Sequence, residues 1–163
     1  MQLSPPLIAV ATGIIGSAWV SGAISSFSIA GAPAAAAVPQ TSARVWAQLY
    51  RRGVATMPKY AGVVALSYLY AAYDAYTRDG PWRILLAAAA CVVSTVPFTF
   101  VAMKKTNDAL HEAAVVEATQ DKNVMAAQVP QLLQTWTRLN SIRGLFPLAG
   151  TILGSVAFLG GQL

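Results

Sequence analysis

The chain has 163 residues, of which 56% are hydrophobic and only 10% are charged, whereas an ordinary soluble domain carries about 25% charged residues. This composition predicts a membrane protein in contact with lipid, and the length predicts a single domain, 1–163. The net charge of +5 comes from 11 lysines and arginines that form no basic stripe, so it indicates membrane topology, and nucleic acid is not an expected partner.

Four apolar segments are close to the length of about 20 residues that a membrane-spanning helix needs. The first carries no charge, lacks the positively charged start of a signal peptide, and is longer than the apolar core of one. We therefore expect a permanent helix there and an all-α fold, an integral membrane four-helix bundle. The expected spans are residues 7–30, 60–76, 82–103 and 142–159.

The connections between the spans differ in character. The first, residues 30–43, reads AGAPAAAAVPQTSA, and Pro33 and Pro39 predict an extended, flexible segment. The third contains TNDALHEAAVVEA and then NVMAAQVPQLLQTWTRLNSI, and both stretches are typical of helices. The last two spans are thus expected to continue beyond the membrane as helical extensions, joined by a turn at residues 121–123.

Positive charges predict the orientation of the bundle. Nine of the 11 lysines and arginines lie in or beside the first and third connections, while Arg78 and Arg83 flank the second. Because cytosolic loops of membrane proteins are enriched in Lys and Arg, the two long connections and the helical extensions are expected in the cytosol. Both termini are then expected on the luminal or external side.

Small residues are frequent in the first and last predicted spans. The last contains GTILG, Gly150 to Gly154, and glycines and serines recur along the first. Such residues let membrane helices approach closely. Two interpretations follow, packing within one subunit and contact between the subunits of a homo-oligomer.

The chain offers few ligands for a metal or redox centre. It has one histidine, His111, and one cysteine, Cys91, which lies in an apolar run and suits a small packing residue. A multi-histidine metal or haem site within one chain is therefore excluded, and neither a metal nor a cofactor is expected. A metal held by His111 with Asp108 or Glu112 is the remaining alternative.

A polar cluster is predicted at the cytosolic membrane boundary. Spacings of four residues put one set of side chains on a stripe of the third helix, and spacings of four and three put another set on the fourth. A short turn makes these helices antiparallel neighbours, so that Asn107 and Asn140 are expected at similar depth. The first stripe is Thr99, Met103, Asn107 and His111, and the second is Trp136, Asn140 and Arg143.

Most members of this cluster also have an interpretation without chemistry. Arg143 and Trp136 suit interfacial anchors of a membrane helix. Asn107 suits a helix cap, and His111 suits a solvated surface position. Asn140 is harder to explain in this way, because an amide at the entrance of a span needs a partner.

These residues resemble a known family. The stretch PFTFVAMKKTNDAL, followed by WTRLNSIRGLFPLAGTILG, is similar to the DUF1772 family of small four-helix membrane proteins, which includes the fungal anthrone oxygenases of aromatic polyketide pathways. The family pattern usually has a proline before its Thr-Asn pair, where this chain has Lys105. The resemblance covers the four-span layout and is specific at Pro97, Phe98, Thr99, Thr106, Asn107, Leu110, Trp136, Asn140 and Arg143.

The resemblance implies a membrane-bound oxygenase that oxidises an apolar aromatic anthrone to an anthraquinone with dioxygen. The single histidine and the scarcity of other metal ligands agree with a reaction without a cofactor. Such a reaction needs a base and a group that stabilises the resulting anion. His111 is the expected base, since an imidazole exchanges protons near neutral pH, and Arg143 is expected to stabilise the oxyanion. Asn107 and Asn140 are expected to hydrogen-bond the substrate oxygens.

The remaining members of the cluster are expected to bind the flat substrate, with Trp136 stacking on it and Phe98, Thr99 and Met103 in contact with it. Two alternatives to the oxygenase stay open. One is an isomerase or cyclase that acts on an apolar natural product, and the other is a non-catalytic bundle whose polar stripe only holds the helices in register.

Overall fold

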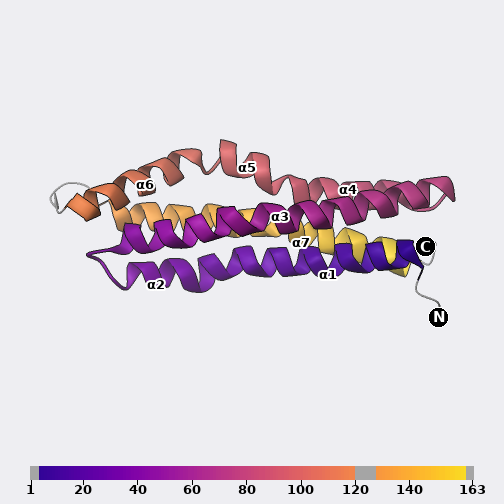
Figure 1. Ribbon diagram of the computed structural model, residues 1–163, viewed down its shortest axis with the longest axis horizontal. Coiled ribbons are helices and arrows are strands. Elements are labelled where there is room, and N and C mark those ends of the chain that lie inside the picture. Colours follow the sequence, from indigo (N-terminus) through magenta and orange to yellow (C-terminus); the bar gives the residue numbers. More distant parts are fainter. Residues whose placement is uncertain (1–3, 120–127, 161–163) are drawn as a thin grey trace. The chain divides into compact units, whose positions relative to one another are not determined.

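The computed structural model describes residues 4–119 and 128–160, and every regular element in these ranges is a helix, which confirms the all-α prediction (Figure 1). The predicted turn at residues 121–123 lies outside the described residues. The elements are α1 (Pro5–Ser26), the π-helical turn η1 (Phe27–Gly31), α2 (Ala32–Ala36), α3 (Ser42–Thr77), α4 (Trp82–Val93), α5 (Thr95–Val101), α6 (Lys104–Thr119) and α7 (Val129–Leu159).

Three stretches of the described chain are long and apolar enough to cross a membrane, namely Pro5–Ala36, Trp82–Val101 and Val129–Leu159. They include or closely match three of the four predicted spans. Residues 60–76 are helical as part of α3, but α3 is not among the three stretches, and its tyrosines and Asp74 make this segment less apolar. The four-helix count therefore stays a prediction.

The predicted extended connection at residues 30–43 is wrong for most of its length. The chain stays helical through η1 and α2 and leaves the helical conformation only at residues 37–41 before α3 begins. Pro33 is the second residue of α2 and directly follows the π-helical turn η1, where the Ala32 N–H bonds the Phe27 carbonyl. This wider turn accommodates the ring and the missing N–H of the proline without ending the helix. The position of the proline within the helix, rather than its presence, decides the local structure.

The predicted third span is helical but interrupted. A break at Ser94 separates α4 from α5, and residues 102 and 103 separate α5 from α6. Pro97 lies in the first turn of α5 and has no N–H for the carbonyl four residues earlier, which explains why the ladder of hydrogen bonds from α4 does not continue.

Two compact units divide the chain. Unit 1 comprises residues 1–22, 57–97 and 144–163, and unit 2 comprises residues 23–56 and 98–143. The polar stripes predicted from the sequence lie in unit 2.

Tyr68 organises the core of unit 1. Its ring is fully buried, and its hydroxyl donates to the Gly150 carbonyl at 2.9 Å and lies 3.1 Å from the Ser17 hydroxyl. A Cβ atom on Gly154 would lie 2.4 Å from the Tyr68 hydroxyl oxygen, and one on Gly13 would lie 2.6 Å from the ring. These small residues therefore serve packing within the subunit.

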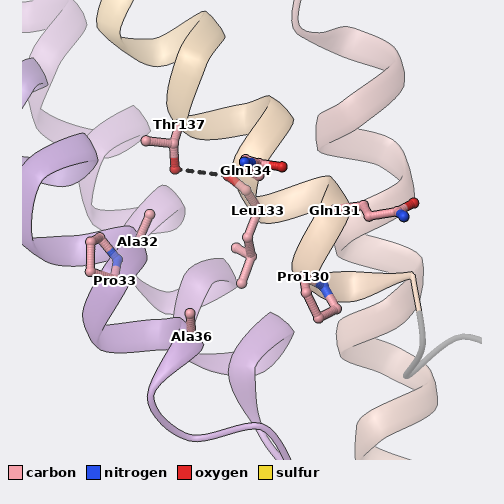
Figure 2. A pocket seen from close by; sticks show the side chains of 8 residues that line it. All are labelled: Ala32, Pro33, Ala36, Pro130, Gln131, Leu133, Gln134 and Thr137. Carbon is pink, nitrogen blue, oxygen red and sulfur yellow. Dashed lines mark hydrogen bonds between the residues drawn. The ribbon is translucent and has the colours of Figure 1, made fainter.

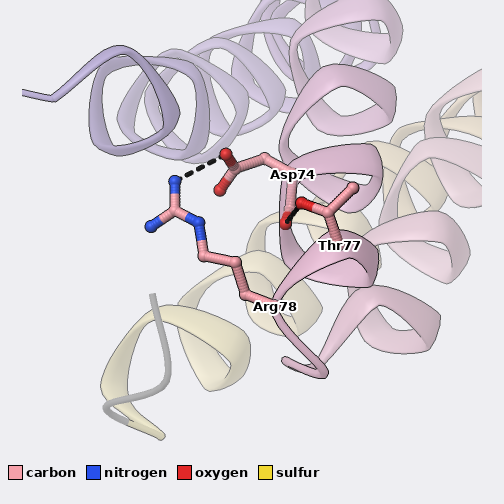
Figure 3. Close-up of polar contacts among 3 residues, drawn as sticks. All are labelled: Asp74, Thr77 and Arg78. Atoms are coloured by element: carbon pink, nitrogen blue, oxygen red, sulfur yellow. Dashed lines mark hydrogen bonds and ion pairs between the residues drawn. The ribbon is translucent and has the colours of Figure 1, made fainter.

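The end of α3 in unit 1 carries a local ion pair (Figure 3). Arg78 reaches back one helical turn, and its Nη2 lies 2.6 Å from Oδ1 of Asp74. The Thr77 hydroxyl donates to the Asp74 backbone carbonyl at 2.8 Å. The carboxylate of Asp74 is thus paired with the residue that directly follows its own helix, which suits a structural role.

The core of unit 2 is aromatic, with Trp46 and Trp136 packed among Met103, Leu110 and Leu133. In the same unit, Glu117 of α6 caps the start of α3. Its two carboxylate oxygens accept the backbone N–H groups of Ala43 and Arg44, each at 3.0 Å. A carboxylate is favourable at a helix N-terminus, where backbone N–H groups lack helical partners, so this cap ties α6 to α3.

Candidate functional site

Two side-chain hydrogen bonds join the helices that carry the predicted stripes. Nε1 of Trp136 donates to Oδ1 of Asn107 at 3.0 Å, and Nη1 of Arg143 donates to the Thr99 hydroxyl at 3.2 Å. The order of these contacts agrees with the predicted antiparallel arrangement. The expected depth was wrong by one turn, because Asn107 meets Trp136 and not Asn140.

The amide of Asn107 has a defined orientation. It is almost fully buried, and an indole N–H only donates, so the atom facing Trp136 must be the carbonyl oxygen. The other end of the amide, Nδ2, donates to the hydroxyl oxygen of Tyr50 at 3.3 Å. Asn107 therefore bridges Trp136 of α7 and Tyr50 of α3.

Asn140 is completely buried and is occupied on both sides of its amide. Its Nδ2 donates to the Ile24 carbonyl at 2.8 Å and to the Ser28 hydroxyl at 2.7 Å. Its Oδ1 accepts from Nη2 of Arg143 at 2.6 Å. Because the two amide protons are both used, Asn140 has no donor left for a ligand.

Arg143 is held by neutral groups. Thr99 and Asn140 accept from its two terminal nitrogens, and neither ion pair found among residues 4–119 and 128–160 involves it. Its Nε is buried and has no hydrogen-bond acceptor within those residues. A partly buried guanidinium with an unused donor and no carboxylate partner is suited to binding an anion.

Tyr50, at one end of the Asn107 bridge, packs with two other aromatic side chains, Trp46 and His111. Tyr50 stacks on Trp46 with ring centroids 5.0 Å apart. The His111 ring meets Trp46 at 4.9 Å and Tyr50 at 5.1 Å, in both cases edge to face. His111 is exposed, so a ligand can reach its imidazole, whereas Trp46 is only 1% exposed.

Sequence reasoning missed Trp46 and Tyr50. Their spacing of four residues at the start of α3 puts both rings on one helical face, but the predicted spans drew attention to the apolar half of that helix. The Nε1 of Trp46 is buried and has no acceptor in the described part of the chain. Trp46 and Arg143 thus each bring an unused donor to unit 2.

The residues expected to line the substrate differ in access. Trp136 is 3% exposed and packs edge to face against Trp46 at 5.8 Å, and Met103 is completely buried. Neither offers an open face. Thr99 and Phe98 are partly buried, and Phe98 packs against the same aromatic core.

A groove of about 410 Å³ lies elsewhere in unit 2, between α2 and the start of α7 (Figure 2). Its lining includes Pro33, Leu133 and Thr137, whose hydroxyl donates to the Leu133 carbonyl at 2.8 Å. Apart from two glutamines and this threonine the lining is apolar, and it contains no titratable side chain. None of the predicted site residues lines this groove, so the polar cluster is the better candidate for chemistry.

Comparisons with known proteins agree on one family. Residues 46–153, from Trp46 onward, match the family model described as anthrone oxygenase. The anthrone oxygenase encC of Aspergillus fumigatus is 35% identical over 90% of this chain and 90% of that protein. The anthrone oxygenase tpcL of the same fungus is 30% identical over 94% of both.

A third relative has a more specific name. The noranthrone monooxygenase of Aspergillus flavus is 32% identical over 71% of this chain and 55% of that protein. No solved structure matches the chain.

Proposed function

The chain belongs to the anthrone oxygenase family, and we propose that it oxidises the methylene of an aromatic polyketide anthrone to the carbonyl of an anthraquinone with dioxygen. In this reaction the CH₂ group supplies four electrons. One oxygen atom enters the product, and the other leaves as water with the two methylene hydrogens. The substrate thus provides all the electrons, so the reaction balances without an external reductant.

The observation that carries this proposal is the environment of Arg143. Removal of a proton from the methylene turns an anthrone into an extended enolate, whose negative charge lies largely on oxygen. Arg143 offers a positive charge whose partners are neutral and whose Nε has no acceptor in the described part of the chain. A positioned donor in apolar surroundings stabilises such an oxyanion much more strongly than water does.

The polar contacts divide the cluster into two roles. Arg143 and His111 are assigned to the substrate, the guanidinium at the oxyanion and the exposed imidazole as the base at the methylene. Asn140, whose amide protons are both used, positions Arg143. Asn107 and Trp136 bind each other and hold the aromatic residues of α3 in place.

The proposed cofactor independence rests on the composition of the chain. A single histidine and a single cysteine do not provide the ligand set of an ordinary iron, copper or haem site. Chelators are therefore expected to leave turnover unchanged. Iron or copper at one equivalent per chain that tracks activity would overturn this part of the proposal.

The proposed setting is a four-span membrane bundle whose first and third connections lie in the cytosol. Three apolar helical stretches and the distribution of lysines and arginines support it. The cluster then lies near the cytosolic boundary, where an apolar tricyclic substrate can partition from the lipid. The free-energy penalty for an arginine N–H without an acceptor is smaller at this boundary than at the bilayer centre.

The test is turnover of a dihydroxyanthrone under air by detergent-purified protein, with a blank for spontaneous oxidation. Oxygen uptake is expected to equal anthraquinone formation. A rearranged product without oxygen uptake would instead support the isomerase. A rate equal to the blank would refute the oxygenase and support the non-catalytic bundle.

Variants of Arg143 link the activity to the site. Loss of one positioned oxyanion donor lowers turnover by roughly 10²–10³-fold, so Arg143→Gln is expected to fall by that order. Arg143→Lys is expected to lose less, because it keeps the charge without the planar fork. The matched control is Arg138→Gln, at an exposed position of the same helix, and it should keep its activity. Near-normal turnover by Arg143→Gln would contradict the proposed role.

A further inference from the structure

The hydrogen bonds around Asn107 run in one direction and end at Tyr50. The Trp136 indole donates to Asn107 Oδ1, so Asn107 must present its N–H to Tyr50. The Tyr50 oxygen is therefore an acceptor in this contact, and the phenolic proton remains available. No acceptor for that proton is found among residues 4–119 and 128–160.

The surroundings of Tyr50 place this proton beside the proposed chemistry. Its ring meets the edge of His111 and stacks on Trp46, which holds the phenol at a defined angle. Tyr50 is only partly buried, and Asn107 links its hydroxyl to Trp136, which lies two helical turns before Arg143 on the same face of α7. The expected base, the expected anion-binding group and an unused O–H donor thus lie around the same part of unit 2.

We propose that Tyr50 is a catalytic residue that donates its hydroxyl proton in a hydrogen bond to the anthrone oxygen. This assignment rests on the proposed function. As the base removes a methylene proton, the C–H electron pair moves through the ring to the carbonyl, and charge grows on that oxygen. The proton stays on the phenol of Tyr50 throughout, so the residue needs no reprotonation between turnovers.

The assignment also explains why Asn107 and Trp136 are buried together. If Asn107 were reversed, it would present its carbonyl oxygen to Tyr50 and would accept the phenolic proton itself. The donor-only indole prevents this reversal. Asn107 and Trp136 are therefore positioning residues that keep the Tyr50 proton directed to the substrate.

The first test uses Tyr50→Phe, which removes the hydroxyl and keeps the ring contacts with Trp46 and His111. Turnover of the anthrone is expected to fall by roughly 10²-fold, as for the loss of one oxyanion donor. The control is Tyr73→Phe, at a position that is 69% exposed in unit 1. An unchanged kcat for Tyr50→Phe in protein of normal thermal stability would refute the proposal.

The second test measures binding, so that it does not depend on oxygen chemistry. Tryptophan fluorescence quenching would give the Kd of two flat tricyclic ligands. 9,10-Anthraquinone carries two carbonyl oxygens, and anthracene carries no oxygen. Tyr50→Phe is expected to weaken anthraquinone binding about 10-fold, the loss of one good hydrogen bond, and to leave anthracene binding unchanged. Equal loss for both ligands would indicate a packing role and overturn the assignment.

A third variant keeps Tyr50 but reverses the direction of its hydrogen bond with residue 107. In Asn107→Asp, both oxygens of the new carboxylate accept, so the phenolic proton is drawn to that carboxylate and away from the substrate. The same selective loss of anthraquinone binding is expected although the hydroxyl is present. A wild-type protein that discriminates between the two ligands through Tyr50 but does not oxidise an anthrone would refute the proposed function alone.

Discussion

Asn140→Ala tests how the site is supported. The substitution removes the acceptor of Arg143 Nη2 and the donor to Ser28 and to the Ile24 carbonyl. Ser28 keeps its own bond to the Thr137 carbonyl at 3.2 Å, and Arg143 keeps Thr99. Hydrogen bonds to charged groups contribute about 1.5–3 kcal/mol and neutral ones about 0.5–1.5 kcal/mol.

The main loss is therefore the charged bond to Arg143, and the free energy of unfolding is expected to fall by about 2–4 kcal/mol. For a chain of this size that corresponds to a decrease in apparent Tm of roughly 5–15 °C. Turnover is expected to fall by about 10-fold or more, less than for loss of Arg143 itself, because the guanidinium remains but has one anchor fewer.

The measurement is thermal unfolding in detergent together with kcat for an anthrone, below the melting range of the variant. Ser141→Ala is the matched control, because Ser141 is the exposed neighbour on α7 and, within residues 4–119 and 128–160, its hydroxyl bonds only the Thr137 carbonyl of its own helix. It is expected to change stability by less than about 0.5 kcal/mol. If Asn140→Ala matched this control in both Tm and kcat, the structural reasoning about the buried amide would be refuted.

Two further predictions concern packing and topology. Gly154→Ala is expected to destabilise unit 1 by about 1–3 kcal/mol, since its Cβ would lie 2.4 Å from the Tyr68 hydroxyl oxygen. The control Gly22→Ala, whose Cβ would have no atom within 4 Å, should be neutral or stabilising. Equal melting temperatures for the two variants would contradict this prediction. In a background without the native cysteine, a cysteine at Gln40 is expected to be labelled only from the cytosolic side of sealed vesicles and one at Asp79 only from the opposite side. The reverse pattern would invert the proposed orientation.

Local spacing was enough to predict the second stripe. Trp136, Asn140 and Arg143 follow spacings of four and three and lie on the single helix α7, so they share one face. The first stripe is divided between two helices, with Thr99 in α5, Met103 in the break and Asn107 in α6. The apolar composition predicted four membrane-spanning helices, and at three of these places the described chain has a helical stretch long and apolar enough to cross a membrane. The same local reasoning failed at Pro33, because a proline accommodated beside a π-helical turn and a proline that ends a helix look alike in sequence.

Tertiary contacts decided what the stripes touch. Trp46 and Tyr50 join the cluster from α3, more than fifty residues before Asn107 in the chain, and no local period reports a contact at that separation. The same holds for the direction of the Asn107 amide, which is decided by the donor-only indole of Trp136 across the helix pair. A spacing defines the face of one helix, whereas the partner of that face and the proton that remains available depend on how the helices pack.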